Sequence, residues 1–434
     1  SSDQVAAFST AQVSALTTTE AATLSAGQAR ALTTAQVQVL NTSNLQALKL
    51  ASVEAMTSTQ LQVLSTTQLN ALETEDFASL TDTQIKALTT AQVQALTTSA
   101  ITSLSGDQVS KFTTAQVAVV TTTNVAALSA DQVAALTTNQ VKSMTTAQLA
   151  ALVTSQASAL SSSDLNVLSQ DQVQALSTTV INNLTTAVLS KLGTAQLAAL
   201  STKQIRALSD AQLTSLTTAQ AAALQSDQVG ALTTTQLIAM ELADLGAINT
   251  DAVAGFSTTQ INKMSFTQLV GMKTSQIVSL STAQIAAIAT SQINGLGTDK
   301  VAALTASQVK ALTTGQLKAM TSLQLSQLSA SNIEVLSTAQ LVNMGTSTIA
   351  KLTTAQLQAL SSTQMSALTS VQVASLDAAQ IAALSAVQVS ALSSDNVSSM
   401  STNQVAALRA EQVSAMTTAQ ASVLKASALT TASI

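Results

Sequence analysis

The stretch that decides the fold is residues 89–96, which read Thr-Thr-Ala-Gln-Val-Gln-Ala-Leu. The pattern recurs without insertion or deletion, and residues 33–40 read Thr-Thr-Ala-Gln-Val-Gln-Val-Leu. All 53 residues numbered in multiples of eight, from 8 to 424, are large and apolar, and 38 of them are Leu. The residue three places earlier is apolar in all 54 units. We predict one continuous array over residues 1–434 without an internal boundary, in which only residues 430–434 leave the pattern.

Each unit carries the signature of a capped helix start. With positions counted from one to eight and ending on the Leu, position one is Ser or Thr in 39 of 54 units. Position four is Gln in 38 of 54. This spacing predicts a capping box, in which the hydroxyl accepts from the N–H of position four and the Gln side chain reaches back to the cap N–H. Positions five and eight then share one face of a short helix.

The charged residues give an independent indication of helix. Of the 21 acidic residues, 19 lie at positions one to four, and 14 of the 16 basic residues lie at positions six, seven or one. A helix dipole favours acid at its start and base at its end, whereas a strand has no such polarity. One long helix is excluded, because eight residues advance about 800° and the apolar stripe would rotate by about 80° per unit.

We therefore predict an all-α solenoid, a superhelix of about 53 tandem units, each a helix of roughly six or seven residues followed by a sharp turn. Leu and Val are expected inside, with Ser, Thr and Gln outside. Gly replaces the cap in three units, where it is expected to use a positive φ: Gly193, Gly297 and Gly345. The alternative is a β-solenoid, since Thr and Val favour strands and three units would make a 24-residue coil.

The composition excludes several classes of function. The chain has no His and no Cys, so it contains no zinc finger, thiol nucleophile, disulfide or Ser-His-Asp triad. With 16 basic and 21 acidic residues, it offers no nucleic-acid surface. No apolar run approaches the roughly 18–20 residues of a membrane span. We expect neither catalysis nor a cofactor.

Two groups of acids are candidates for weak calcium sites, because Ca²⁺ takes several carboxylate ligands. The first comprises Glu73, Glu75, Asp76 and Asp82, and the second comprises Glu241, Asp244 and Asp251, near Asn249. Neither group has the ligand spacing and central Gly of an EF-hand loop. We interpret both as solvated first-turn acids and expect no metal.

Residues 238–273 depart most from the common unit. Their large position-eight residues, such as Phe256, are variants of the core, and Gly replaces the usual Ala of position seven at Gly255 and Gly271, as it does at Gly295. Phe266 differs because it lies at position two, on the expected outer face. An exposed aromatic residue is a candidate contact between subunits.

The repeated unit is similar to known repeat families. Tandem Leu-Thr-Thr-Ala-Gln-Val-x-Ala-Leu, as at residues 88–96, resembles the arrays of very large bacterial surface and filament-forming proteins. The shorter pattern Leu-(Ser/Thr)-x-x-Gln-(Val/Leu/Ile)-x-x-Leu is similar to the mini-helical superhelix of the mesothelin and stereocilin group, which often has a Pro after the cap that this chain lacks. The resemblance covers nearly the whole chain and implies an extracellular structural role.

From this resemblance and the low charge we expect an extracellular structural protein that assembles with itself into a filament, sheath or surface layer. Cell-surface polysaccharide and O-linked glycans are further candidate partners. The alternative is an adhesin stalk or spacer that presents another domain without assembling; a minor one is an ice- or surface-binding array. Because the chain begins Ser1-Ser2, we expect it to be a processed or partial piece of a longer protein.

Overall fold

The computed structural model describes residues 1–424 and divides the chain into two compact units, Ser1–Leu216 and Thr217–Ile434. Among the described residues there are 52 α-helices of four to six residues each, one 3₁₀-helix of seven residues and no strand. The predicted all-α solenoid is confirmed, and the β-solenoid alternative is wrong. That the array has no internal boundary stays a prediction, and the departure at residues 430–434 lies outside the described residues.

The helices of the first unit follow the eight-residue period throughout. In chain order they are α1 (Ser2–Ala6), α2 (Thr10–Ser14), α3 (Thr18–Ala22), α4 (Ala26–Ala31), α5 (Thr34–Gln38), α6 (Thr42–Ala47), α7 (Leu50–Glu54), α8 (Ser58–Val63), α9 (Thr66–Leu69), α10 (Thr74–Ser79), α11 (Asp82–Ala87), α12 (Thr90–Ala95), α13 (Thr98–Ser103), α14 (Gly106–Ser110), α15 (Thr114–Val119), α16 (Thr122–Ala127), α17 (Ala130–Ala134), α18 (Thr138–Ser143), α19 (Thr146–Ala150), α20 (Thr154–Ala157), α21 (Ser162–Asn166), α22 (Gln170–Ala175), α23 (Thr178–Asn182), α24 (Thr186–Leu189), α25 (Thr194–Ala199), α26 (Thr202–Ala207) and α27 (Asp210–Thr214).

The second unit continues the same period, with one 3₁₀-helix in place of an α-helix. In chain order its helices are α28 (Thr218–Ala223), α29 (Ser226–Ala231), α30 (Thr234–Ala239), α31 (Leu242–Ala247), α32 (Thr250–Val253), α33 (Thr258–Lys263), α34 (Phe266–Gly271), α35 (Thr274–Val278), α36 (Thr282–Ala287), η1 (Thr290–Leu296), α37 (Gly297–Ala302), α38 (Ala306–Ala311), α39 (Thr314–Ala319), α40 (Ser322–Ser326), α41 (Ala330–Glu334), α42 (Thr338–Asn343), α43 (Thr346–Ile349), α44 (Thr354–Gln358), α45 (Ser362–Ala367), α46 (Ser370–Ala374), α47 (Ala378–Ala383), α48 (Ala386–Ser390), α49 (Ser394–Ser398), α50 (Thr402–Ala406), α51 (Ala410–Ser414) and α52 (Thr418–Val423).

Two consecutive extended residues make the turn between helices. At the end of α12, Leu96 has φ −54° and ψ 135°, and the cap residue Thr97 that follows has φ −70° and ψ 158°. Both conformations are ordinary for L-residues, so the turn needs no glycine. Because positions eight and one are both extended, the α-helices have at most six residues, the lower end of the predicted six or seven.

The glycines at position one correct one prediction and confirm another. Gly193 and Gly345 have φ of −61° and −62°, so the positive φ predicted for them is wrong. Gly297 has φ 69° and is the one residue with positive φ in the described part of the chain. The residue before it, Leu296, has a helical ψ of −29°, whereas position eight is usually extended. The change of chain direction between η1 and α37 therefore falls on Gly297, which as a glycine adopts a positive φ without strain.

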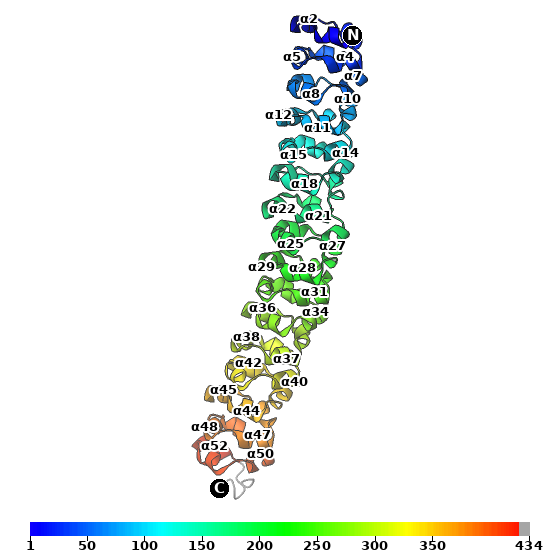
Figure 1. The fold of residues 1–434 in the computed structure, drawn as a ribbon. Helices are drawn as coiled ribbons and strands as arrows, with labels where there is room; N and C mark the ends of the chain where they lie inside the picture. The colour runs from blue at the N-terminus through cyan, green and yellow to red at the C-terminus, as the bar shows by residue number, and fades with distance from the viewer. Residues whose placement is uncertain (425–434) are drawn as a thin grey trace. The chain divides into compact units, whose positions relative to one another are not determined.

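Within each unit the helices wind into a solenoid. Each helix packs against the third helix along the chain, as α2 does against α5 and α5 against α8, which follow one another down one side of the first unit in Figure 1. The core is formed by positions five and eight: Val93 is fully buried and Leu96 is 4% exposed. The predicted interior of Leu and Val is therefore confirmed.

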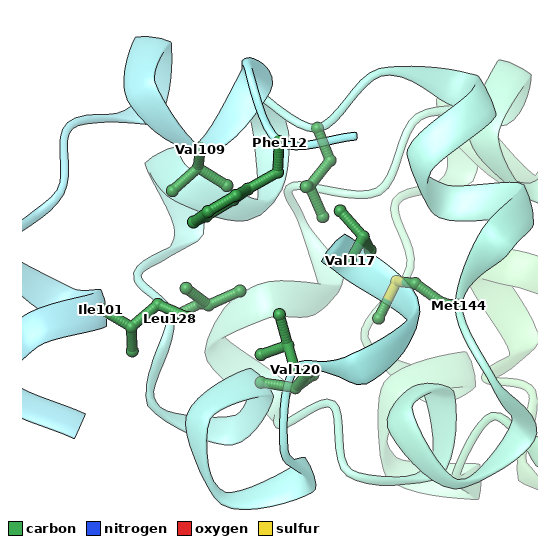
Figure 2. A pocket seen from close by; sticks show the side chains of 9 residues that line it. Ile101, Val109, Phe112, Val117, Val120, Leu128 and Met144 are labelled. Atoms are coloured by element: carbon green, nitrogen blue, oxygen red, sulfur yellow. The ribbon is translucent and has the colours of Figure 1, made fainter. Parts of the chain in front are cut away.

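A small apolar cavity of about 20 Å³ lies in the core of the first unit. Figure 2 shows the side chains of Phe112, Val120 and Leu128 pointing toward one another around it. Val120, which lines this cavity, is the single Val among the 53 position-eight residues, and its side chain is one methylene shorter than the usual Leu.

Replacing Val120 by Leu is expected to stabilise the first unit by about 0.5–1 kcal/mol, because it buries one more methylene in space that is already open. Denaturant unfolding of the full chain measures the change. The matched control is Val93→Leu, at a fully buried position-five Val away from the cavity, which is expected to destabilise through overpacking. Equal effects of the two substitutions would contradict this account of the cavity.

Candidate functional site: the glutamine ladder

The predicted capping box is present at the start of each regular helix. In α12 the N–H of Gln92 donates to Thr89 Oγ1 at 3.2 Å, and the N–H of Thr89 donates to Gln92 Oε1 at 2.8 Å. Two of the backbone donors that a helix start leaves without partners are thereby satisfied. The sequence prediction is confirmed at this point.

The other half of the Gln side chain has a partner that the prediction missed. Gln92 is 3% exposed, and its Nε2 donates to the carbonyls of Leu61 and Leu64, both at 2.8 Å. The first carbonyl belongs to α8 and the second to the residue that ends it, four eight-residue repeats earlier in the chain. The prediction that the Gln side chains lie outside is therefore wrong, because the primary amide connects two successive turns of the solenoid.

We call the residues that repeat this contact the glutamine ladder. Each is a position-four Gln whose Nε2 donates to a backbone carbonyl 28 to 31 residues earlier. In the first unit they are Gln36, Gln60, Gln68, Gln84, Gln92, Gln108, Gln116, Gln132, Gln140, Gln148, Gln156, Gln172, Gln196, Gln204 and Gln212. In the second unit they are Gln260, Gln268, Gln276, Gln284, Gln308, Gln316, Gln324, Gln340, Gln356, Gln364, Gln372, Gln380, Gln388, Gln404, Gln412 and Gln420.

The ladder satisfies buried carbonyls at the helix ends. A helix leaves its last carbonyls without intrahelical donors, and an unpartnered buried carbonyl costs on the order of 1–3 kcal/mol. Each helix also packs against the third helix along the chain, while the ladder reaches the fourth. One turn of the solenoid therefore takes between three and four helices, a number that the eight-residue spacing alone does not define.

Other residues at position four show which part of the Gln side chain each contact needs. Asn124, which is one methylene shorter, keeps only the bond from Nδ2 to the carbonyl 28 residues earlier, that of Leu96, at 2.8 Å. The Ser52 hydroxyl donates to Leu24 in the same way at 2.7 Å. Lys300 is buried, and its Nζ donates to the carbonyl of Val270 at 3.0 Å. Each of these three replacements therefore supplies a donor toward the previous turn.

The first acidic group does not gather into one site. Asp76 is buried at position four, where its Oδ2 accepts from the N–H of Glu73 at 2.9 Å. Asp82 instead pairs with Lys111 at 3.2 Å. Burial raises the pKa of Asp76, and the charges of Glu73 and Glu75 raise it further against the lowering effect of the Glu73 hydrogen bond. Within residues 1–424 no group of three or more acids is placed to hold a metal ion.

The second acidic group is also divided among different roles. Asp244 is buried at position four, and burial together with the charge of Glu241 raises its pKa. Asn249 caps α32, since its Oδ1 accepts from the N–H of Ala252 at 2.8 Å. Its Nδ2 donates to the carbonyl of Leu224 at 3.2 Å. Asn249 thereby combines a cap with a bond to the previous turn.

Replacing Asp76 by Gln is expected to stabilise the chain at pH 7 by about 1–3 kcal/mol, since it restores a donor toward the previous turn and removes a buried charge. The raised pKa means that ionisation of Asp76 disfavours the folded state, so the penalty is present above the folded pKa and is relieved as pH falls through it. The advantage of the variant should therefore shrink on acidification. Denaturant unfolding of both proteins between pH 7 and pH 3 measures it, and an advantage independent of pH would contradict the assignment.

Phe266, the predicted contact residue, lies at the surface. It is the first residue of α34, and its side chain is 49% exposed. Its ring lies over Gly295, where an added Cβ would meet Phe266 Cδ2 at 3.3 Å. Leu242 lies in the same way against Gly271, at 3.4 Å. In both pairs a position-two residue meets a position-seven Gly 29 residues later. Whether Phe266 contacts another subunit stays a prediction.

No helix among the described residues is long and apolar enough to cross a membrane. This follows from the architecture, because an extended turn ends every α-helix after at most six residues.

Comparison with known proteins gives one family match. The family is described as the ALTTAQ repeat, and its model matches more than half of the chain, at residues 69–106, 109–146, 181–210, 203–234, 237–274, 267–298, 277–314 and 338–370. No curated protein matches the sequence. The matches lie in both units, as expected for a tandem array of one repeated element.

Proposed function

The chain belongs to the ALTTAQ repeat family, and from this premise we propose that it is an extracellular structural protein that assembles with copies of itself into a filament, sheath or surface layer. The proposal extends the resemblance of its units to the arrays of large bacterial surface and filament-forming proteins. The mini-helical superhelix of the mesothelin and stereocilin group offers a parallel for the fold.

The observation that carries the proposal is the regularity of the solenoid surface. The ladder repeats through both units, so similar Ser, Thr and Ala side chains are exposed turn after turn. A weak contact that one turn makes with a neighbouring molecule is then available at many turns, and multivalency raises the total affinity steeply. Because only 9% of the residues are charged, repulsion between copies is small.

The same surface suits further partners outside the cell. Exposed hydroxyls at positions one and two can hydrogen-bond to cell-surface polysaccharide or carry O-linked glycans. The chain contains no Cys, so an oxidising environment neither crosslinks nor inactivates it through thiols. We expect catalysis to play no part in this role.

Light scattering and electron microscopy of the purified full chain test the proposal. Above a critical concentration the chain should form ordered filaments or sheets, with or without calcium. Thr90→Lys together with Thr114→Lys adds charge at exposed positions of two packed helices, α12 and α15, and should raise that concentration. A chain that stays monomeric at all concentrations would contradict assembly and favour the stalk or spacer.

A further inference from the structure

Two consecutive repeats of the second unit, residues 289–304, depart from the regular α-helix. They form η1 and α37, and η1 is the one 3₁₀-helix within the described residues 1–424. Gly295 and Gly297 lie on either side of Leu296, and glycine is a poorer helix former than every residue except proline. A 3₁₀-helix of seven residues is unusually long, and its hydrogen bonds have poorer geometry than those of an α-helix. We call residues 289–304 the η1 segment.

Neither helix of the η1 segment begins with a side-chain cap. Ala289, which precedes η1, has no hydroxyl, and the residue before α37 is Leu296. Every other helix without a side-chain cap bond in the described part of the chain has a capped helix on both sides. The η1 segment is therefore the one place there where two successive helix starts lack this partner for their backbone N–H groups.

The η1 segment is also weakly bonded to the turn before it. Gln292 lies at position four, yet within residues 1–424 its side chain donates to no carbonyl of that turn. Lys300, the position-four residue of the next repeat, donates only to the carbonyl of Val270, at 3.0 Å. Two repeats thus share a single ladder bond to the previous turn, whereas Gln316 alone makes three.

The bonds that the η1 segment receives from the following turn are weak as well. Gln324 Nε2 lies 3.3 Å from the carbonyl of Ile293, and among the described residues it makes no bond to the carbonyl of Leu296. The helical ψ of Leu296 accounts for this, because it directs the carbonyl along the helix axis. Asn332, which is shorter than Gln, makes one bond to the carbonyl of Leu304 at 3.1 Å.

Lys300 adds an unfavourable burial to this segment. It is 8% exposed, and it forms no ion pair within residues 1–424. An ammonium group loses its hydration on burial, and a single carbonyl replaces only part of that hydration. The usual Gln carries no charge and reaches more than one carbonyl, as Gln316 does.

We propose that the η1 segment is a joint at which the second unit opens while its other turns stay folded. In a solenoid each turn is held by its two neighbours, so local opening begins where both of these interfaces are weakest. The released residues lengthen a chain under tension while the core on either side stays buried. The use of the joint in a filament rests on the proposed function, whereas the opening itself does not.

Hydrogen exchange of the full chain, below the concentration at which it assembles, tests the opening. The slowest amides of η1 and α37 should exchange at least tenfold faster than the slowest amides of α36 and α38. Ala289→Ser combined with Lys300→Gln supplies a cap and a ladder side chain, and it should slow exchange in the η1 segment at least fivefold. The control is Lys310→Gln, which changes an exposed Lys of α38 and should alter these rates less than twofold.

Trypsin gives a second readout, because Lys300 is buried while Lys310 and Lys318 are exposed. Of these three residues, Lys300 should be the first after which the folded chain is cut, and Ala289→Ser should slow that cut at least threefold. A first cut after Lys310 or Lys318, or equal exchange in all four helices, overturns the joint and leaves the proposed function standing. A chain that opens at η1 but never assembles overturns the proposed function alone.

Discussion

Replacing Gly255 by Ala is expected to destabilise the second unit by on the order of 3 kcal/mol or more. A Cβ on Gly255 would lie 1.9 Å from the carbonyl oxygen of Ser226 and 2.6 Å from its carbon. The opposing Gly230 faces the carbonyl of Gly255, at 2.7 Å from an added Cβ. Because the obstacle is backbone, relief of the clash requires helices α29 and α32 to separate.

The expectation is the reverse of what the repeat pattern indicates. Ala is the usual residue at position seven, so Gly255→Ala brings the unit closer to consensus. Gly315→Ala is the matched control, because its Cβ would meet its nearest neighbour at an ordinary 3.5 Å. Within helix α39 this change should stabilise by about 0.5–1 kcal/mol. Denaturant unfolding and hydrogen exchange at α29 and α32 measure both, and a neutral Gly255→Ala would contradict the close approach.

Replacing Gln60 by Ala is expected to lower the free energy of unfolding by about 2–4 kcal/mol. Its Oε1 accepts from the N–H of Thr57 at 2.7 Å, and its Nε2 donates to the carbonyls of Ala29 and Leu32 at 2.9 and 2.7 Å. Truncation leaves these buried backbone groups without partners, which costs more than the hydrogen bonds themselves contribute. Hydrogen exchange should report lost protection at α4 and α8.

Two controls separate the contact from the loss of a side chain. Gln62→Ala removes an exposed Gln from the same helix and should change stability by less than about 0.5 kcal/mol. Gln60→Glu keeps the acceptor but loses the donor, so it should destabilise at pH 7 and recover in part at low pH, where a protonated carboxyl can donate. If Gln60→Ala and Gln62→Ala lower the free energy of unfolding by the same amount, the ladder contributes nothing to stability.

The local structure of each unit was predictable from eight residues. Thr89 and Gln92 define a helix start, and the i to i+3 spacing of Val93 and Leu96 defines the buried face, because caps and amphipathic spacing act within one turn of helix. The predicted upper length of seven residues is wrong, since nothing local shows that position eight becomes extended before the cap.

Contacts between turns were not predictable, because they join residues 28 to 31 positions apart. One signal did point to the ladder. Glu at position four completes a capping box as well as Gln does, yet Gln occupies 38 of 54 units and Glu only one, the exposed Glu20. A preference for the neutral amide indicates that a donor is needed too. The pairing of Leu242 with Gly271 is visible only once the 29-residue spacing is known.

The central claim is that the position-four Gln side chains bond to the previous turn, and exchange of their amide protons tests it most directly. In the full chain labelled with ¹⁵N at glutamine side chains, NMR distinguishes protected from free carboxamides. The account predicts two populations, with buried ladder residues such as Gln92 exchanging much more slowly than exposed ones such as Gln62. A single population that exchanges at the rate of free glutamine would contradict it.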